Sequence, residues 1–94
     1  MPMFKQLDPL LHSQMRLAVM STLVSVESAD FTYLKEITHA TAGNLSVQLN
    51  KLAEADYIVI NKGYEGKRPK TTCRMTDVGR EAFKEYVEAL KSYL

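Results

Sequence analysis

Amide and ammonium side chains recur at helical spacing in one stretch of the chain. Asn44 and Gln48 stand four positions apart, and Lys51 follows three positions later. Residues three and four apart share one face of a helix. An amide side chain can pair bidentately with adenine in the major groove, and an ammonium group can neutralise a phosphate. This spacing therefore indicates a polar helix face that can read double-stranded DNA.

The predicted helix covers residues 42–55, and Thr41 is a suitable N-cap because its hydroxyl can accept a hydrogen bond from the free amide of Asn44. The opposite face carries the apolar residues Leu45, Leu49 and Leu52. Val47 lies on the polar side, where it could pack on a thymine methyl group. A polar face that is merely solvated is the alternative. The residues of this segment that we expect to contact DNA are Thr41, Gly43, Asn44, Ser46, Val47, Gln48 and Lys51.

A basic hairpin is predicted directly after this helix, over residues 57–75. Residues 57–60 are short and β-branched enough to form a strand, residues 62–69 are expected to form the loop, and residues 70–75 the returning strand. Gly66 would let the loop backbone approach a ligand closely. Three basic side chains at the tip of the hairpin would follow phosphates or enter the minor groove. They are Lys67, Arg68 and Lys70.

Positive charge is concentrated in this helix and hairpin. Residues 41–76 carry six basic and three acidic side chains, a net charge of +3, whereas residues 1–40 and residues 77–94 each carry three basic and four acidic side chains. The whole chain has a net charge of only +1. A DNA-binding surface would need the positive charge where it is found. A solvated hairpin can also be basic without any partner.

Two further helices are expected before this segment. The first spans residues 9–26 and begins at a proline, with Asp8 as its N-cap. The second is short, spans residues 33–39, and follows a brief strand near Phe31. The apolar residues expected to point inward from it are Leu34 and Ile37.

A last helix is expected over residues 77–94, capped by Thr76. The resulting order is helix, helix, helix, strand, strand, helix, which is the winged-helix arrangement. The predicted fold is thus mainly α with a small antiparallel β-hairpin. Residues 1–94 would form one domain, because a chain of this length builds a single hydrophobic core.

The apolar side chains of the last helix lie on more than one narrow stripe of its surface. Some must cover the core, and the others could pair with the first helix or with a second copy of the chain. Burying a few such side chains fully contributes about 1.5–3 kcal/mol each, which would support a homodimer. Packing within the domain is the alternative. The residues expected at a dimer interface are Leu10, Leu11, Phe83, Tyr86, Val87, Leu90, Tyr93 and Leu94.

Other kinds of chemistry find little support. Cys73 is the only cysteine, and His12 and His39 are too far apart in sequence to form a metal-ligand pattern. No combination of nucleophile, base and acid indicates an enzyme, and no pattern indicates a cofactor. The absence of a long apolar run and of a signal-peptide pattern predicts a cytoplasmic protein without a membrane partner.

Three segments resemble small MarR- and ArsR-like winged-helix transcriptional regulators. They are LDPLLHSQMRLAVMSTL, TAGNLSVQLNKLAEADYIV and EGKRPKTTCRMTDVGREAF. The last contains a glycine-arginine-proline type of wing tip and a Met-Thr-x-x-Gly-Arg run at the start of the final helix. The resemblance covers about residues 7–90. One departure is Asp56, where the family usually has a glycine in the left-handed conformation that ends the recognition helix.

The resemblance implies a homodimer that binds a palindromic operator and regulates transcription. The helix at residues 42–55 would be its recognition helix, residues 57–75 its wing, and residues 77–94 its core and dimerisation helix. A small-molecule effector stays unknown. The alternative function is a protein-binding winged-helix module that does not bind DNA.

Overall fold

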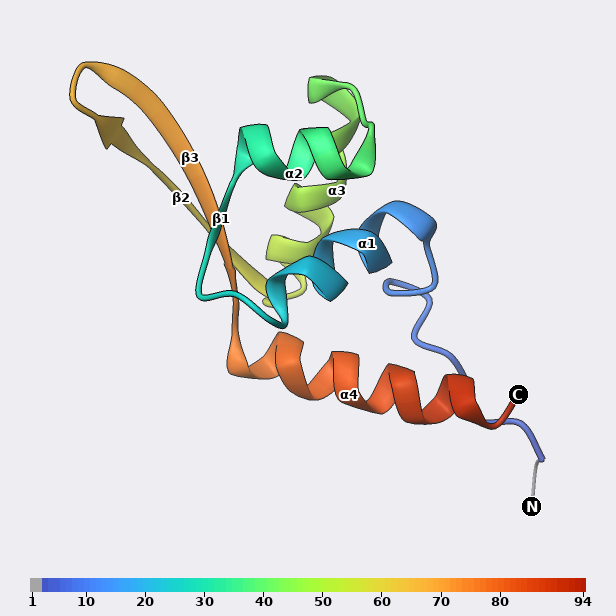
Figure 1. The fold of residues 1–94 in the computed structure, drawn as a ribbon. Helices are drawn as coiled ribbons and strands as arrows, with labels where there is room; N and C mark the ends of the chain where they lie inside the picture. Colours follow the sequence, from blue (N-terminus) through green and yellow to red (C-terminus); the bar gives the residue numbers. More distant parts are fainter. Residues whose placement is uncertain (1–2) are drawn as a thin grey trace.

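A computed structural model describes residues 3–94 of the chain. In this part of the chain, helices form most of the body, and a β-hairpin projects from it (Figure 1). Helix α4 lies on the side of the body away from α2. The elements in chain order are α1 (Gln14–Leu23), β1 (Ala29–Asp30), α2 (Phe31–Thr38), α3 (Ala42–Glu54), β2 (Ile58–Glu65), β3 (Arg68–Met75) and α4 (Asp77–Lys91). This confirms the expected winged-helix order.

The sheet is antiparallel with strand order β1-β3-β2. Glu65 pairs with Arg68, so the hairpin is closed by two residues only, of which Gly66 has a φ of 65°. A type II′ turn places glycine at this first position. The predicted loop over residues 62–69 is therefore wrong, because both strands continue almost to the tip. Pro69 is tolerated there because β1 pairs with β3 only further down, which leaves that edge of β3 free.

The start of the first helix is also corrected. The carboxylate of Asp8 accepts a hydrogen bond from the amide of Leu10 at 2.9 Å, but the turn that it begins is not continued as a helix. Ser13 interrupts it with an extended backbone at φ −150° and is itself the N-cap of α1. Helix α1 thus begins at Gln14 and ends before residue 26.

Helix α2 is capped by Asp30, whose carboxylate accepts the amide hydrogen of Tyr33 at 2.7 Å, and it ends at His39 with a φ of 55°. Leu34 is buried as expected, but the side chain of Ile37 is 40% exposed. The prediction that Ile37 points inward is wrong, because a helix of only eight residues buries a narrow stripe.

Helix α3 carries the core on its apolar face. The three leucines that the spacing placed there, Leu45, Leu49 and Leu52, are all buried. They belong to one cluster with Val19, Met20 and Leu23 of α1. The polar face of α3 is consequently turned away from this cluster, since the leucines fix the rotation of the helix.

The end of α3 is held against α4. Asp56 adopts the left-handed conformation that the resemblance to winged-helix regulators predicted at this position, with a φ of 66°. The hydroxyl of Thr76 donates to the carbonyl of Asp56 at 2.6 Å, and the amide of Thr76 donates to the carbonyl of Tyr57 at 3.1 Å. Gly79 packs so closely that an added Cβ atom would lie 2.0 Å from the Tyr57 carbonyl oxygen. These contacts set where α3 ends and β2 begins.

Among residues 3–94, no helix combines the length and the apolar character that crossing a membrane requires.

Candidate nucleic-acid interface

The polar face of α3 is accessible. Of its predicted contact residues, Gln48 is half-buried, and those that are exposed are Thr41, Gly43, Asn44, Ser46, Val47 and Lys51. Thr41 is the N-cap, as expected: its hydroxyl accepts the amide hydrogen of Asn44 at 3.2 Å. The side chain of Val47 is 50% exposed although it is apolar. The face thus offers amide, hydroxyl and methyl groups together, the groups with which proteins read base edges.

Two amide side chains of this face are hydrogen bonded to each other. The Nε2 atom of Gln48 donates to the Oδ1 atom of Asn44 at 3.1 Å. The Oε1 atom of Gln48 accepts a hydrogen bond from the guanidinium of Arg16, which belongs to α1. Residues 44 and 48 are therefore brought together as their spacing predicted, and α1 contributes to their surroundings.

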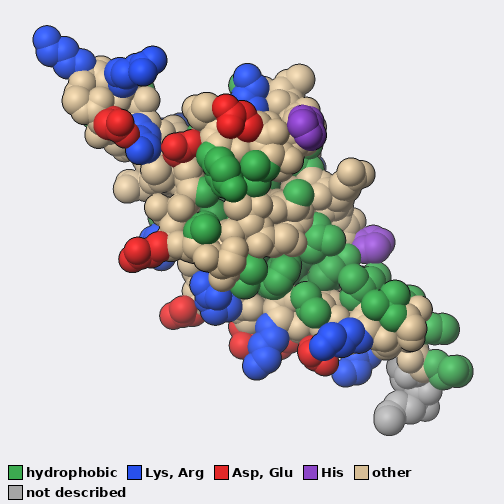
Figure 2. Space-filling view, in the orientation of Figure 1, with side chains coloured by type: hydrophobic (Ala, Val, Ile, Leu, Met, Phe, Trp, Pro, Cys, Tyr) green, Lys and Arg blue, Asp and Glu red, His purple; other side chains and the backbone are tan. Residues whose placement is uncertain are grey.

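The hairpin presents positive charge at its end (Figure 2). All residues from 61 to 70 are exposed. The ammonium group of Lys70 lies 2.6 Å from the carboxylate of Glu65, and this hydrogen bond and charge raise the pKa of Lys70. Lys67 and Arg68 do not take part in the ion pairs found among residues 3–94. They are the better placed of the three predicted wing residues to neutralise phosphates.

A cleft of about 250 Å³ lies between α3 and the base of the wing. Its polar lining comes from α3, β2 and β3 and consists of Ser46, Asn50, Lys62 and Thr71. Of these residues, the sequence had indicated only Ser46 as a DNA contact. The hydroxyl, amide and ammonium groups there are suited to a backbone phosphate. Because β2 continues to Glu65, Lys62 lies on the same face of the strand as Ile60, two positions before it. This two-residue spacing is the sequence signal that could have placed Lys62 in the cleft.

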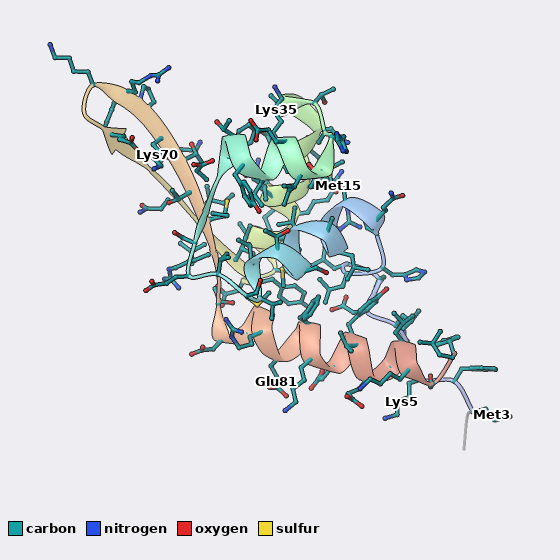
Figure 3. All side chains as sticks on the ribbon, in the orientation of Figure 1. Met3, Lys5, Met15, Lys35, Lys70 and Glu81 are labelled. Carbon is teal, nitrogen blue, oxygen red and sulfur yellow. The ribbon has the colours of Figure 1, made fainter. Side chains whose placement is uncertain are left out.

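Lys35 is a further basic residue that the sequence analysis missed. It lies at the end of the body where α3 begins, on the same side of the molecule as the hairpin with Lys70, whereas Glu81 and Lys5 lie on the opposite side (Figure 3). Its signal was weak, because a single lysine on a short helix is common.

The residues predicted at a dimer interface fall into two groups. The side chain of Leu11 is fully buried in the core and Tyr86 is buried beside it, so both already have partners within the chain. At the other end of the range, the side chain of Tyr93 is 46% exposed and that of Leu94 is 97% exposed. The remaining four are half-buried: Leu10, Phe83, Val87 and Leu90.

The first described residues and the C-terminal end of the chain lie close together and form one apolar end of the molecule (Figures 1 and 2). The rings of Phe4 and Tyr93 are stacked, with centroids 4.9 Å apart. The hydroxyl of Tyr93 donates to the carbonyl of Lys5 at 2.8 Å, and the amide of Lys5 donates to the hydroxyl of Ser92 at 3.0 Å. The N-terminal segment therefore enlarges the apolar surface of α4.

Cys73 is buried in β3, with 1% of its surface exposed, and burial raises the pKa of its thiol to about 11. The thiolate is the reactive form, so the native protein should react very slowly with iodoacetamide at pH 8. Unfolding in guanidinium should accelerate the reaction by orders of magnitude. Mass spectrometry of the alkylated protein measures both rates, and fast modification of the native protein would contradict this placement.

Comparison with known proteins agrees with the fold. The family model of the winged helix DNA-binding domain matches residues 15–94. An uncharacterized protein of Methanocaldococcus jannaschii is 37% identical over 76 residues, which span 81% of this chain and 83% of that protein. The structure of a transcriptional regulator homologue from Pyrococcus horikoshii OT3 matches with a TM-score of 0.82 and 27% identity, over 89% of this chain and 83% of that chain.

The structure of NadR in complex with 4-hydroxyphenylacetate matches with a TM-score of 0.73 over 90% of this chain and 62% of that chain. At 19% identity this match concerns the fold alone. The resemblance to winged-helix regulators that the sequence indicated is confirmed by the family model and by the structure from Pyrococcus horikoshii. The matched family is one of DNA-binding domains and not of enzymes. Because its model covers the segment from α1 to the end of the chain, the protein belongs to the winged-helix DNA-binding domain family.

Proposed function

We propose that the protein is a transcriptional regulator that binds a specific sequence in double-stranded DNA. The observation that carries the proposal is the division of α3 into a buried leucine face and an accessible face of amides, hydroxyls and Val47. That face lies next to a hairpin with a basic tip. Membership of a DNA-binding family supports it, as does the similarity to the regulator homologue of Pyrococcus horikoshii.

In the proposed complex, α3 lies in the major groove. Asn44 and Gln48 read base edges, Val47 packs on a thymine methyl group, and Lys51 neutralises a phosphate at the end of the helix. The wing, with Lys67 and Arg68 at its tip, follows the backbone or enters the minor groove. A phosphate of the intervening backbone lies over the cleft that contains Lys62.

We further propose that two copies act together on a palindromic operator. The apolar end of the molecule, with Phe4, Tyr93 and Leu94, is the surface that a second copy would cover, and the half-buried residues of α4 continue it. In a two-fold dimer of this kind the recognition helices would be about 34 Å apart and would meet half-sites one helical turn apart.

Replacing Tyr93 and Leu94 together with serine should weaken this dimer at least tenfold, because two exposed apolar side chains would lose their partner. Light scattering behind size exclusion, over a range of protein concentrations, measures the dimer dissociation constant. Val78→Ser removes an apolar side chain of similar exposure from the other end of α4 and is the matched control. A wild-type protein that stays monomeric, or a dimer equally weakened by Val78→Ser, would refute the proposed interface.

DNA binding itself is tested by a gel shift of purified protein on mixed genomic fragments, repeated across salt concentrations. Binding should weaken steeply with salt, because counterions are released from neutralised phosphates. The control is a variant in which Lys51, Lys62, Lys67 and Arg68 are all alanine. If the wild-type protein bound DNA no better than this variant at low salt, the alternative function of a protein-binding winged-helix module would be favoured.

A further inference from the structure

Arg16 lies at the junction between α1 and the polar face of α3. Its Nε atom donates to the carbonyl of Leu10 at 2.6 Å, and its Nη1 atom donates to the Oε1 atom of Gln48. The side chain is half-buried, and it takes no part in the two ion pairs found among residues 3–94. An arginine whose charge is not matched by a carboxylate is here used to bridge a backbone carbonyl and a side-chain amide.

The contact determines how the two amides of α3 are oriented. A guanidinium group donates hydrogen bonds and cannot accept them, so the oxygen of Gln48 must face Arg16. The nitrogen of Gln48 then faces the oxygen of Asn44, to which it donates at 3.1 Å. The nitrogen of Asn44 is in turn 3.8 Å from the sulfur of Met15, the residue next to Arg16. Each amide thereby has one defined orientation instead of two.

Each amide keeps part of its hydrogen-bonding capacity. An amide group has two N–H donors and an oxygen with two lone pairs, and the chain Arg16–Gln48–Asn44 uses one donor and one lone pair of Gln48. One N–H donor and one lone pair of Gln48 are therefore not used by these two hydrogen bonds. Side chains that are already ordered lose less conformational entropy on binding than free ones.

We propose that Arg16 is a positioning residue for DNA recognition: it orders the Gln48 and Asn44 amides before DNA binds and thereby sharpens the choice of base. The proposal rests on the proposed function, because it concerns the same polar face. It differs from a direct phosphate contact, in which Arg16 would raise affinity for all sequences alike and steepen the salt dependence.

The first arm of the test needs no DNA. In the nitrogen-15 NMR spectrum of the whole protein, Arg16→Met should shift the side-chain amide signals of Gln48 and Asn44, while the side-chain signal of Asn61 on β2 stays unchanged. Arg16→Lys keeps the charge but cannot span the Leu10 carbonyl and Gln48 in the same way, so it should act similarly. It also serves as the second variant if Arg16→Met reduces folding. Unchanged amide signals in both variants would overturn the ordering role.

The second arm measures affinity for a selected operator and for the same operator with one substituted base, at several salt concentrations. Arg16→Met should reduce the ratio of the two affinities about tenfold, which corresponds to about 1.4 kcal/mol, and leave the salt slope unchanged. In a Gln48→Ala background it should have no additional effect on the ratio, because Arg16 acts through Gln48.

Two other outcomes would overturn the proposal in distinguishable ways. Arg16 would be a phosphate contact if Arg16→Met lowered the salt slope by about 0.9 per protomer. In that case the effects of Arg16→Met and Gln48→Ala on affinity would simply add. A wild-type protein without any base preference would refute the proposed function and the role of Arg16 in discrimination. The NMR arm would then still decide whether Arg16 orders the two amides.

Discussion

Replacing Gly79 with alanine is expected to lower the free energy of unfolding by about 3 kcal/mol. The new Cβ atom would lie 2.0 Å from the carbonyl oxygen of Tyr57 and 2.8 Å from its carbonyl carbon, and a backbone cannot move aside as a flexible side chain can. Overpacking in a well-packed site costs about 1–3 kcal/mol, and contact with backbone belongs at the upper end. A domain of this size would lose roughly 12–24 °C in Tm for such a change.

Gly43→Ala is the matched control for this prediction, since Gly43 is also a helical glycine but a Cβ atom there would have nothing within 4 Å. It should raise stability by about 0.5–1 kcal/mol through helix propensity. Chemical denaturation followed by circular dichroism measures both variants. If Gly79→Ala were as stable as Gly43→Ala, the close packing of α4 on the end of α3 would be contradicted.

Replacing Lys67 and Arg68 with alanine is expected to cause the largest loss in DNA binding. Each phosphate neutralised adds about 0.9 to the magnitude of the slope of log K against log salt concentration, so the slope should fall by about 1.8 per wing. A dimer with two engaged wings should lose about 3.6. Fluorescence anisotropy of a labelled duplex, titrated at four or more salt concentrations, measures the slope.

Lys70→Ala should reduce the slope less than either tip residue, because Glu65 already shares the charge of Lys70 at 2.6 Å. The control for charge alone is a variant in which Lys84 and Lys91, both exposed on α4, are alanine. Its slope should match that of the wild-type protein. A wing variant with an unchanged slope would remove the wing from the mechanism.

Helix α3 could be predicted closely because its signals are local. Thr41 caps it as expected, the three leucines fix its rotation, and it ends at Glu54 instead of residue 55. The presence of the hairpin could be predicted, but the length of its strands could not. Whether the chain after Ile60 continues as a strand depends on its pairing with residues 68–72. The composition of either segment alone does not show how far this pairing extends.

The start of the first helix and two of the predicted dimer residues were wrong for related reasons. Asp8 has the right type to cap a helix, but its carboxylate also accepts a hydrogen bond from the hydroxyl of Tyr57 at 2.6 Å, and this contact across 49 positions has no local signal. The dimer residues were selected from an apolar pattern, and a pattern of that kind does not distinguish contacts within the chain from contacts with a second copy. Leu11 and Tyr86 therefore entered the prediction although both lie in the core.

The candidate interface residues that were missed lie outside the polar face of α3 and the tip of the hairpin. Lys62 and Thr71 line the cleft only because the strands continue past the positions where the sequence ended them. Arg16 has the spacing of an ordinary helix residue, and only the packing of α1 against α3 places its guanidinium on Gln48. In both cases the position of the residue depends on strand pairing or helix packing, which the residue's own segment does not reveal.

Selection of bound sequences from random duplex DNA measures whether the polar face of α3 reads bases while the wing holds the backbone. The wild-type protein should enrich one sequence with two inverted half-sites whose centres are about 10–10.5 base pairs apart. A variant with Asn44→Ala and Gln48→Ala, checked for its fold, should bind random DNA with the same salt slope but enrich that sequence weakly. Equal enrichment by this variant and the wild-type protein, or no enrichment by either, would contradict the account.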